Sequence, residues 1–254
     1  MVKGVSIKFQ SYAETIPRLL DLINLKRELK KYDKIVLKPS LFFSENPELE
    51  SKSTKKEFVE VILKYCLQNK NPVSEVFIVE GADGVETTEL FDKYGYKELA
   101  EKYSVGLIDL NNAETEEITK DDFLRFDSIH YPKILKDSFV ISIPKLSHDS
   151  EMEVIGSLSN MIGAFPSSYY QGFFSRRKNK IRKWPIKYSI HDISKCKIPE
   201  LTIIDASEFG SILAGQPLEM DKQAVKILGL DWRNVSHIKL IDETIPVEKI
   251  EQAK

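Results

Sequence analysis

Cysteine is scarce in this sequence, and long apolar runs are absent. The 254 residues include only Cys66 and Cys196, which lie far apart and share no metal-ligand spacing, so we expect neither an iron–sulfur cluster nor a structural zinc site. No segment approaches the ~18 consecutive apolar residues of a membrane helix. The N-terminus also lacks the long apolar region of a signal peptide. These absences predict a cytoplasmic protein that does not enter a membrane.

Neither sign of charge dominates the composition. The formal net charge is -2, so the molecule as a whole is not a polycation, and any nucleic-acid role must depend on a local patch. The apolar fraction of 42% and the charged fraction of 30% are typical of a globular protein. The length suits one large domain or two small ones. We predict a single α/β domain over residues 1–254, with a loop insertion at residues 166–184 that carries a basic run.

Short apolar runs, which are typical of buried strands, alternate with patterns of helical spacing. The expected strands include residues 34–38, 75–80, 105–110, 138–143, 201–205 and 237–241. The expected helices include residues 14–31, 54–69, 151–165 and 220–228. Strands that alternate with helices predict a mostly parallel, twisted sheet with helices on both faces.

Residues 138–165 form the centre of this pattern. A run of β-branched residues ends at Pro144, a polar turn with Lys145 and His148 follows, and a helical pattern comes next. In open α/β sheets, ligands bind beyond the carboxyl ends of the strands, near helix N-termini. Lys38 has the equivalent position at the end of an earlier strand. We therefore predict that Lys38, Lys145 and His148 surround one cavity.

This cavity is expected to bind a small anion. Lys38 and Lys145 would hold a phosphate or carboxylate group, and His148 or His191 would move protons. The candidate catalytic residues are His148, His191 and Lys145, and the candidate ligand-binding residues are Lys38, Ser40, Asp83, Asn160 and Asp205. The alternatives are surface lysines in loops, a histidine that only makes hydrogen bonds, and a metal or acid–base set of two histidines with Asp205. We assign no metal ligand.

The strongest charge signal is a basic run at residues 176–183, which has aromatic residues on both sides. The candidate phosphate contacts are Arg176, Arg177, Lys178, Lys180, Arg182, Lys183 and Trp184. Cations neutralise phosphates and rings stack on bases, so RNA or ribosome binding is one interpretation. The others are a solvated basic face and a loop that folds over the cleft to hold an anionic substrate. Side chains packed against the cleft would favour a ligand role, and side chains presented outward would favour RNA.

Five stretches in a shared order resemble domain-of-unknown-function family three-six-two. They are residues 35–41, 91–101, 140–146, 158–163 and 201–205. The resemblance implies a prokaryotic α/β protein, without the ferredoxin-like module that is often fused to members of the family. The reaction of the family is not generally established. A more distant similarity connects the chain to the α/β domain of lactate racemase, a nickel-cofactor enzyme.

The chain departs from the family pattern in three places. The turn from Pro144 to His148 is one residue shorter than usual and lacks the family's second lysine. Ser40 replaces an asparagine, and a glycine-rich insertion is reduced to residues 206–215. His191 does match a histidine of the family. The departures imply that part of an ancestral site is lost, which favours a non-catalytic derivative.

Two functions are consistent with these features. The first is an enzyme with an anionic-ligand cleft at the carboxyl ends of the strands, acting on a small molecule that bears phosphate or carboxylate. The second is a non-catalytic RNA- or ribosome-binding protein that uses residues 173–184. The direction of the basic side chains distinguishes the two.

Overall fold

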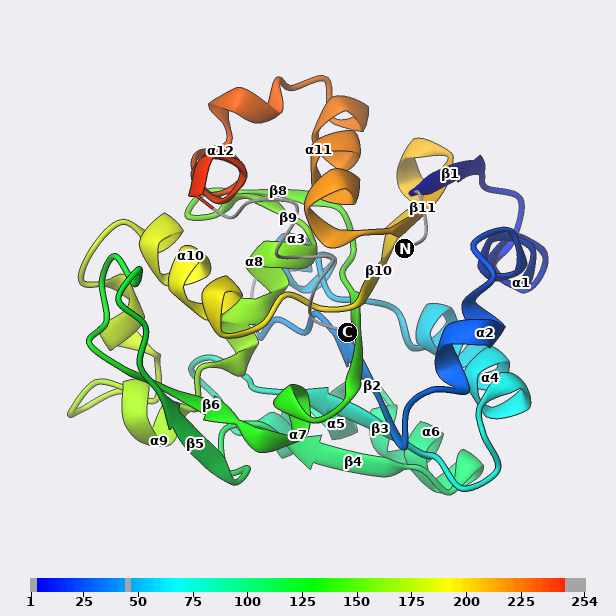
Figure 1. Cartoon of the computed structure of the whole chain (residues 1–254), viewed down its shortest axis with the longest axis horizontal. Coiled ribbons are helices and arrows are strands. Elements are labelled where there is room, and N and C mark those ends of the chain that lie inside the picture. Colours follow the sequence, from blue (N-terminus) through cyan, green and yellow to red (C-terminus); the bar gives the residue numbers. More distant parts are fainter. Residues whose placement is uncertain (1–3, 44–46, 245–254) are drawn as a thin grey trace.

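The computed structural model describes residues 4–43 and 47–244. Its central sheet consists of β1 (Val5–Lys8), β2 (Lys34–Pro39), β3 (Glu75–Glu80), β4 (Gly106–Asp109), β7 (Phe139–Ile143), β10 (Leu201–Ala206) and β11 (Ser211–Gly215). These strands have the order β1-β11-β10-β7-β2-β3-β4 (Figure 1). Neighbours from β10 to β4 are parallel, and β11 runs antiparallel to both β10 and β1. The predicted α/β fold with a mostly parallel sheet is therefore confirmed.

Helices cover both faces of the sheet, as predicted (Figure 1). One face carries α1 (Tyr12–Leu22), α2 (Leu25–Leu29), α4 (Lys56–Asn69), α5 (Thr87–Lys93) and α6 (Tyr96–Tyr103). The other carries α8 (Ser157–Asn160), α10 (Ile186–Cys196), α11 (Pro217–Ile227) and α12 (Ser236–Thr244). Successive side chains of a strand point to opposite faces of the sheet. Ile35 and Leu37 therefore belong to the core that includes α4, whereas Val36 belongs to the core that includes α8.

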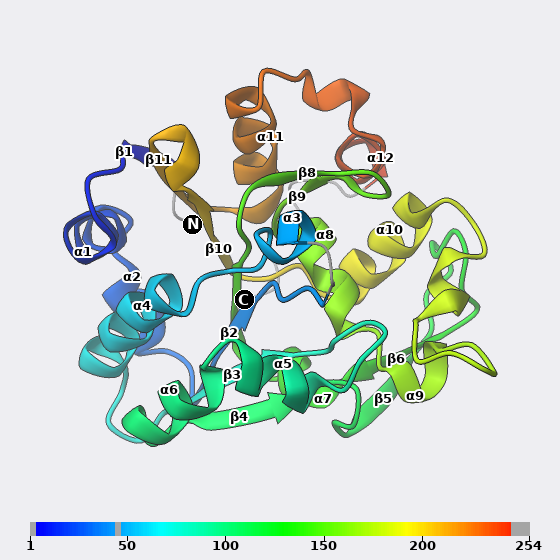
Figure 2. The ribbon, with the colours of Figure 1, turned by 180° about the vertical axis from the view of Figure 1, so that it is seen from behind.

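Smaller elements complete the fold. They are α3 (Pro47–Glu50), β5 (Thr115–Ile118), β6 (Ile129–Pro132), α7 (Lys133–Lys136), β8 (Ser147–Asp149), β9 (Glu153–Ile155), η1 (Met161–Ala164), α9 (Ser167–Tyr170), η2 (Asn179–Arg182), η3 (Ser207–Phe209) and η4 (Trp232–Asn234). The β8–β9 hairpin lies beside α12, where the Glu153 carboxylate accepts the Ser236 backbone N–H (Figure 2). No helix in the described part of the chain is long and apolar enough to cross a bilayer.

The helix expected over residues 151–165 is wrong in its first half. The β8–β9 hairpin replaces it, because Asp149 Oδ1 accepts the N–H groups of Glu151 and Met152 and closes a tight turn. The helix begins only at Ser157, where the carboxylate of Asp221 accepts two backbone N–H groups. A complete hairpin, β8–β9, therefore lies between the strand β7 and the helix α8.

Two other expectations also need correction. The helix expected over residues 14–31 is divided into α1 and α2 at Asn24, which has the left-handed φ of 53°. The strand expected over residues 237–241 is the helix α12, in which His237, Ile238 and Ile241 face the core at helical spacing. The short apolar run at residues 237–241 is consistent with either a strand or a buried helix, and its pattern alone does not distinguish them.

Candidate functional site

A pocket with a volume of about 480 Å³ lies beyond the carboxyl ends of β2 and β3. Its walls come from the segments that follow these strands, from α3, the β8–β9 turn, α8 with η1, and the basic insertion. The lining residues are Ser40, Leu41, Phe42, Phe43, Leu49, Glu80, Gly81, Asp83, Gly84, Asp149, Ser150, Glu151, Met152, Ile155, Ser159, Asn160, Ile162, Gly163, Arg177, Lys178 and Arg182. This is the edge at which open α/β sheets bind ligands.

A buried ion pair forms the floor of the pocket. Lys38 Nζ donates to Glu80 Oε1 at 2.8 Å and to Asn160 Oδ1 at 2.9 Å. The Asn160 amide nitrogen donates in turn to the Lys38 carbonyl and to Ser142 Oγ. Burial lowers the pKa of Lys38, and the charge of Glu80 opposes this shift. The network connects β2, β3, β7 and α8 at a single point.

Two glycines let the backbone approach this network closely. A Cβ at Gly163 would lie 2.3 Å from Glu80 Oε1 and 2.7 Å from Lys38 Nζ. A Cβ at Gly81 would lie 2.2 Å from the Gly163 carbonyl oxygen. Any side chain at either position would displace the floor of the pocket.

The basic insertion folds over the pocket. Lys178 is fully buried, and its Nζ donates to the carbonyl oxygens of Gly81 at 2.8 Å and Gly163 at 3.3 Å. Burial lowers its pKa to about 7. Asp83 accepts the Lys178 backbone N–H at 2.7 Å and pairs with Arg182, also at 2.7 Å. Arg182 pairs in addition with Glu151 of the β8–β9 turn, so the insertion joins two walls of the pocket.

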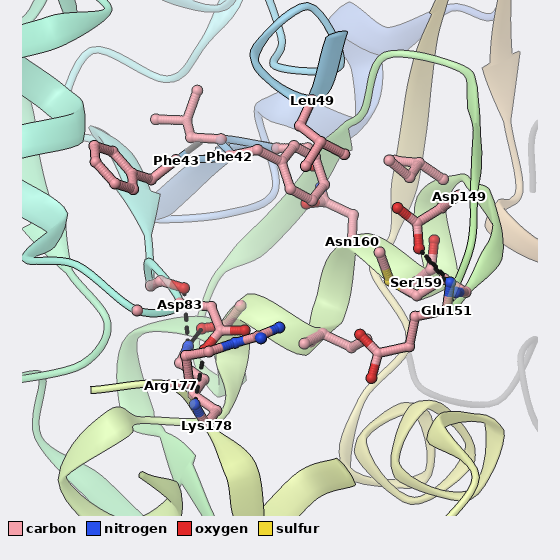
Figure 3. A pocket seen from close by; sticks show the side chains of 18 of the residues that line it. Phe42, Phe43, Leu49, Asp83, Asp149, Glu151, Ser159, Asn160, Arg177 and Lys178 are labelled. Atoms are coloured by element: carbon pink, nitrogen blue, oxygen red, sulfur yellow. Dashed lines mark hydrogen bonds between the residues drawn. The ribbon is translucent and has the colours of Figure 1, made fainter. Parts of the chain in front are cut away.

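Arg177 contributes a basic side chain to the lining of the pocket. Its side chain is exposed and, within the described residues, its guanidinium has neither a hydrogen-bond nor an ion-pair partner. Figure 3 shows it beside Lys178, with Phe42, Phe43 and Leu49 on the opposite wall. The pocket thus combines one available positive charge with an apolar wall.

The comparison with protein families now identifies the chain. The family model described as "Domain of unknown function (DUF362)" matches residues 35–222. The chain belongs to this family. The resemblance seen in the sequence motifs is therefore confirmed, and the DUF362 match covers both the floor of the pocket and its basic insertion. No match is found among curated proteins.

One solved structure with a similar fold is the lactate racemase apoprotein from Thermoanaerobacterium thermosaccharolyticum. The TM-score is 0.52 at 14% sequence identity, over 96% of the DUF362 chain and 58% of the racemase. The DUF362 chain therefore spans less than two thirds of the length of that protein. At this identity the likeness concerns the fold alone.

The structure brings together four of the predicted ligand-binding residues. Ser40, Asp83 and Asn160 line the pocket, and Lys38 lies directly beneath it. Asp205 does not join them, because its carboxylate accepts a hydrogen bond from the Tyr12 hydroxyl at 2.7 Å beyond the end of β10.

The candidate catalytic residues of the DUF362 chain lie elsewhere. Lys145 Nζ contacts Glu208 Oε1 and the Ser51 carbonyl, each at 2.6 Å, and His148 is exposed on β8. Lys38, Lys145 and His148 therefore do not share this pocket, contrary to our prediction. His191 is buried in α10, with its Nδ1 2.7 Å from Asp192 Oδ1. Any catalytic role of Lys145, His148 or His191 would lie outside the pocket.

The suggested metal or acid–base set is also separated. His148, His191 and Asp205 occupy three different environments, an exposed strand, a buried helix and the end of β10. Within residues 4–43 and 47–244, no group of three or more His, Cys, Asp or Glu side chains has a metal-binding arrangement. We therefore derive no step through a metal.

The rest of the basic run faces outward. Arg176 pairs with Glu86, Lys180 donates to the Tyr169 carbonyl, and Lys183 and Trp184 are exposed. The run is thus divided, with Arg177, Lys178 and Arg182 at the pocket and the remaining cations on the surface.

Sequence reasoning missed Asp221 and the apolar wall. Asp221 is buried and caps α8 from a helix far along the chain, and no local pattern marks it. Phe42 and Phe43 lie in a segment without periodicity. Glu80 did carry a signal, since it is an acid at the end of an otherwise apolar strand.

Proposed function

We propose that this DUF362 chain is a cytoplasmic enzyme acting on a small molecule with a phosphate or carboxylate group, which it binds in the pocket above Lys38 and Glu80. The observation that carries the proposal is the guanidinium of Arg177, which has no partner among the described residues and lines a pocket of about 480 Å³. A guanidinium suits both kinds of anion, because its planar donors match two oxygens at once.

Lys178 supports a chemical role. It lies next to Arg177 in the chain, and its amine is held by the carbonyls of two glycines that line the pocket. With a pKa of about 7, the amine exchanges a proton near neutrality, as a general acid or base must. Lys38 does not have this freedom, since Glu80 and Asn160 hold it in place.

The fold is compatible with an enzyme, because a lactate racemase apoprotein shares it. That likeness gives no information about the substrate. The proposal depends on the pocket itself.

RNA or ribosome binding is the less favoured proposal. Basic side chains turned toward the cleft were expected to favour a ligand role, and Arg177, Lys178 and Arg182 line the pocket. The nucleic-acid role would depend on Arg176, Lys180, Lys183 and Trp184, of which Arg176 already pairs with Glu86.

A screen by ligand-observed NMR tests the proposal. The wild-type chain is mixed with sets of small phosphates and carboxylates, and the compounds that bind are tested again with Arg177→Gln. Arg176→Gln is the matched control, because it removes the same charge one residue away at a side chain that does not line the pocket. We expect binding that Arg177→Gln weakens and Arg176→Gln does not.

Turnover is measured separately on the compounds that bind. We expect the wild type to convert at least one of them and Lys178→Met to lose the conversion while still binding, as followed by proton NMR. Binding that Arg177→Gln does not weaken would contradict the proposed ligand site. Conversion by Lys178→Met equal to that of the wild type would contradict the proposed catalytic role of Lys178.

A further inference from the structure

Phosphate sites at the ends of parallel strands are usually made from free backbone N–H groups. In this pocket the N–H groups that follow β2 are already used. Ser40 N donates to Thr54 Oγ1 at 3.0 Å and Leu41 N donates to Glu80 Oε2 at 3.3 Å. Phe42 N donates to a serine hydroxyl, Ser53 Oγ, at 2.9 Å. These three N–H groups are therefore not free for a phosphate.

The first two N–H groups after β3 are also used. Gly81 N donates to Glu80 Oε1 at 2.8 Å, and Ala82 N donates to Thr87 Oγ1 at 3.1 Å. These two N–H groups are not free for a phosphate, and Gly81 serves close packing against the Gly163 carbonyl.

The start of α8 is filled by a side chain of the protein itself. Asp221 accepts the N–H groups of Ser157 at 2.6 Å and Leu158 at 2.9 Å. A ligand phosphate would have to displace a buried carboxylate from these donors.

Two of the basic side chains at the pocket have carboxylate partners. Arg182 is neutralised by Asp83 and Glu151, and Lys38 is neutralised by Glu80. Asp149, another carboxylate of the lining, pairs with Lys52 at 3.5 Å. Lys178 Nζ is held by the carbonyl oxygens of Gly81 and Gly163, so among the described residues Arg177 is the basic side chain of the lining whose charged group has no partner. A second negative charge on the ligand would have no free cation to offset it. A single carboxylate matches the charge of Arg177.

The rest of the pocket is suited to an apolar body. Phe42, Leu49, Met152, Ile155 and Ile162 line it, and its volume of about 480 Å³ exceeds what a bare small anion fills. Ser40 adds a hydroxyl without a hydrogen-bond partner in the described part of the chain, at the end of β2. A polar substituent on the ligand can bind there.

We infer that the ligand of this pocket is an amphipathic monocarboxylate, whose carboxylate binds Arg177 and whose apolar body packs against the wall around Phe42. This inference rests on the proposed function and narrows it, because it excludes phosphate esters and nucleotides as the preferred ligands. Charge-assisted bidentate hydrogen bonds to one arginine supply the selectivity for the acid.

Isothermal titration calorimetry near neutral pH tests the inference with four probes. They are phenylbutanoate, its neutral amide, phenylpropyl phosphate and butanoate, which separate the charge, the type of anion and the apolar body. We expect phenylbutanoate to bind about 10- to 100-fold more tightly than the amide, as for one charge-assisted contact. Butanoate is expected to bind about 10-fold more weakly or worse, because it lacks the ring. The phosphate ester is expected to bind no more tightly than the carboxylate.

Two variants locate the effect. Arg177→Gln should remove the difference between acid and amide, and Arg176→Gln should preserve it. Thermal unfolding of both variants shows whether each is folded before it is titrated.

The remaining outcomes overturn the inference in distinguishable ways. A phosphate ester that binds about 10-fold more tightly than the carboxylate, with both weakened by Arg177→Gln, would refute the monocarboxylate and leave the proposed function standing. Equal binding of acid and amide by the wild type would refute the inference as well. Absence of binding by every probe at millimolar concentration, or binding that Arg177→Gln leaves unchanged, would refute both.

Discussion

Lys38 Nζ lies 2.8 Å from Glu80 Oε1, and the two side chains are 0% and 4% exposed. Both charges are therefore removed from water, and each is tolerated because the other is present. Glu80 also accepts the N–H groups of Gly81 and Leu41, so the pair holds the ends of β2 and β3 in a fixed relation. The shape of the pocket floor depends on this contact.

We expect Lys38→Met to lower the free energy of unfolding by about 3–5 kcal/mol, because it leaves the Glu80 charge buried without its partner. Urea unfolding of the variant and the wild type measures the loss. Lys64→Met is the matched control, because Lys64 is half exposed in its pair with Glu60 and its replacement should cost much less. Similar losses for the two variants would contradict a special role for the buried pair.

Gly163→Ala is expected to destabilise the protein by about 1–3 kcal/mol, as an overpacked position does. The new Cβ would lie 2.3 Å from Glu80 Oε1, an atom that the buried network holds in place. The control is Gly172→Ala, whose Cβ would meet the end of the Asn179 side chain on the surface. Thermal unfolding measures the stability of the two variants. A Gly163→Ala variant as stable as Gly172→Ala would show that the Lys38–Glu80 network moves to accommodate the new Cβ.

Much of the fold was readable because its strands are short β-branched runs bounded by turn residues. The run that ends at Lys38 became β2, and the lysine, Ser40 and Asn160 were placed at the right edge of the sheet. Lys145 was misplaced for a physical reason. Beyond Pro144 the chain forms a bridge with Asp205, which draws Lys145 toward β10 and away from Lys38.

The contacts that enclose the pocket join residues far apart in the sequence, and local patterns do not predict them. A run of cations has the same appearance in the sequence whether it is solvated or buried, and only the fold shows that Lys178 is enclosed while Lys183 is exposed. Likewise, the cap on α8 comes from Asp221, 64 residues beyond Ser157. Contacts of this kind leave no periodic signal in the chain.

Asp221→Ala should cost about 2 kcal/mol of unfolding free energy, because two buried N–H groups at the start of α8 lose their acceptor. Gln216→Ala provides the control. Gln216 caps α11 through a single exposed hydrogen bond, so its removal should cost below about 1 kcal/mol. Urea unfolding measures both losses. Equal losses for Asp221→Ala and Gln216→Ala would mean that water replaces the Asp221 side chain as the hydrogen-bond acceptor at the start of α8.

The salt dependence of RNA binding is expected to be shallow. Only Arg176, Lys180 and Lys183 of the basic run lie away from the pocket, and three contacts to a single strand give a log–log slope of about -2. Fluorescence anisotropy with single-stranded RNA at several salt concentrations measures the slope for the wild type and for the variant with all three residues changed to Ser. A slope of about -4 for the wild type that falls only to about -2 in the triple variant would place the pocket cations on RNA and favour the nucleic-acid role.

The last prediction concerns the effect of pH on Lys178. Its pKa is lowered to about 7 by burial, whereas a lysine in the unfolded chain titrates near ~10.4. Between these two values the unfolded chain binds a proton that the folded protein does not. The contribution to stability is therefore complete above the unfolded pKa and is lost as pH falls toward about 7. The free energy of unfolding should rise with pH across this window, by at most about 1.4 kcal/mol per pH unit.

Lys178→Met removes this dependence, so the difference in unfolding free energy between wild type and variant should grow from pH ~7 to pH ~9. Taking the difference cancels the titration of Cys66 and Cys196, whose pKa values burial raises to about 12 in the fold. Urea unfolding at intervals across the window gives the slope, and Lys180→Met, at an exposed lysine of the same run, is the matched control. A constant difference for Lys178→Met would mean that the amine keeps its proton in the fold. Lys178 would then serve as a fixed cation in the pocket wall instead of a group that exchanges a proton near neutrality.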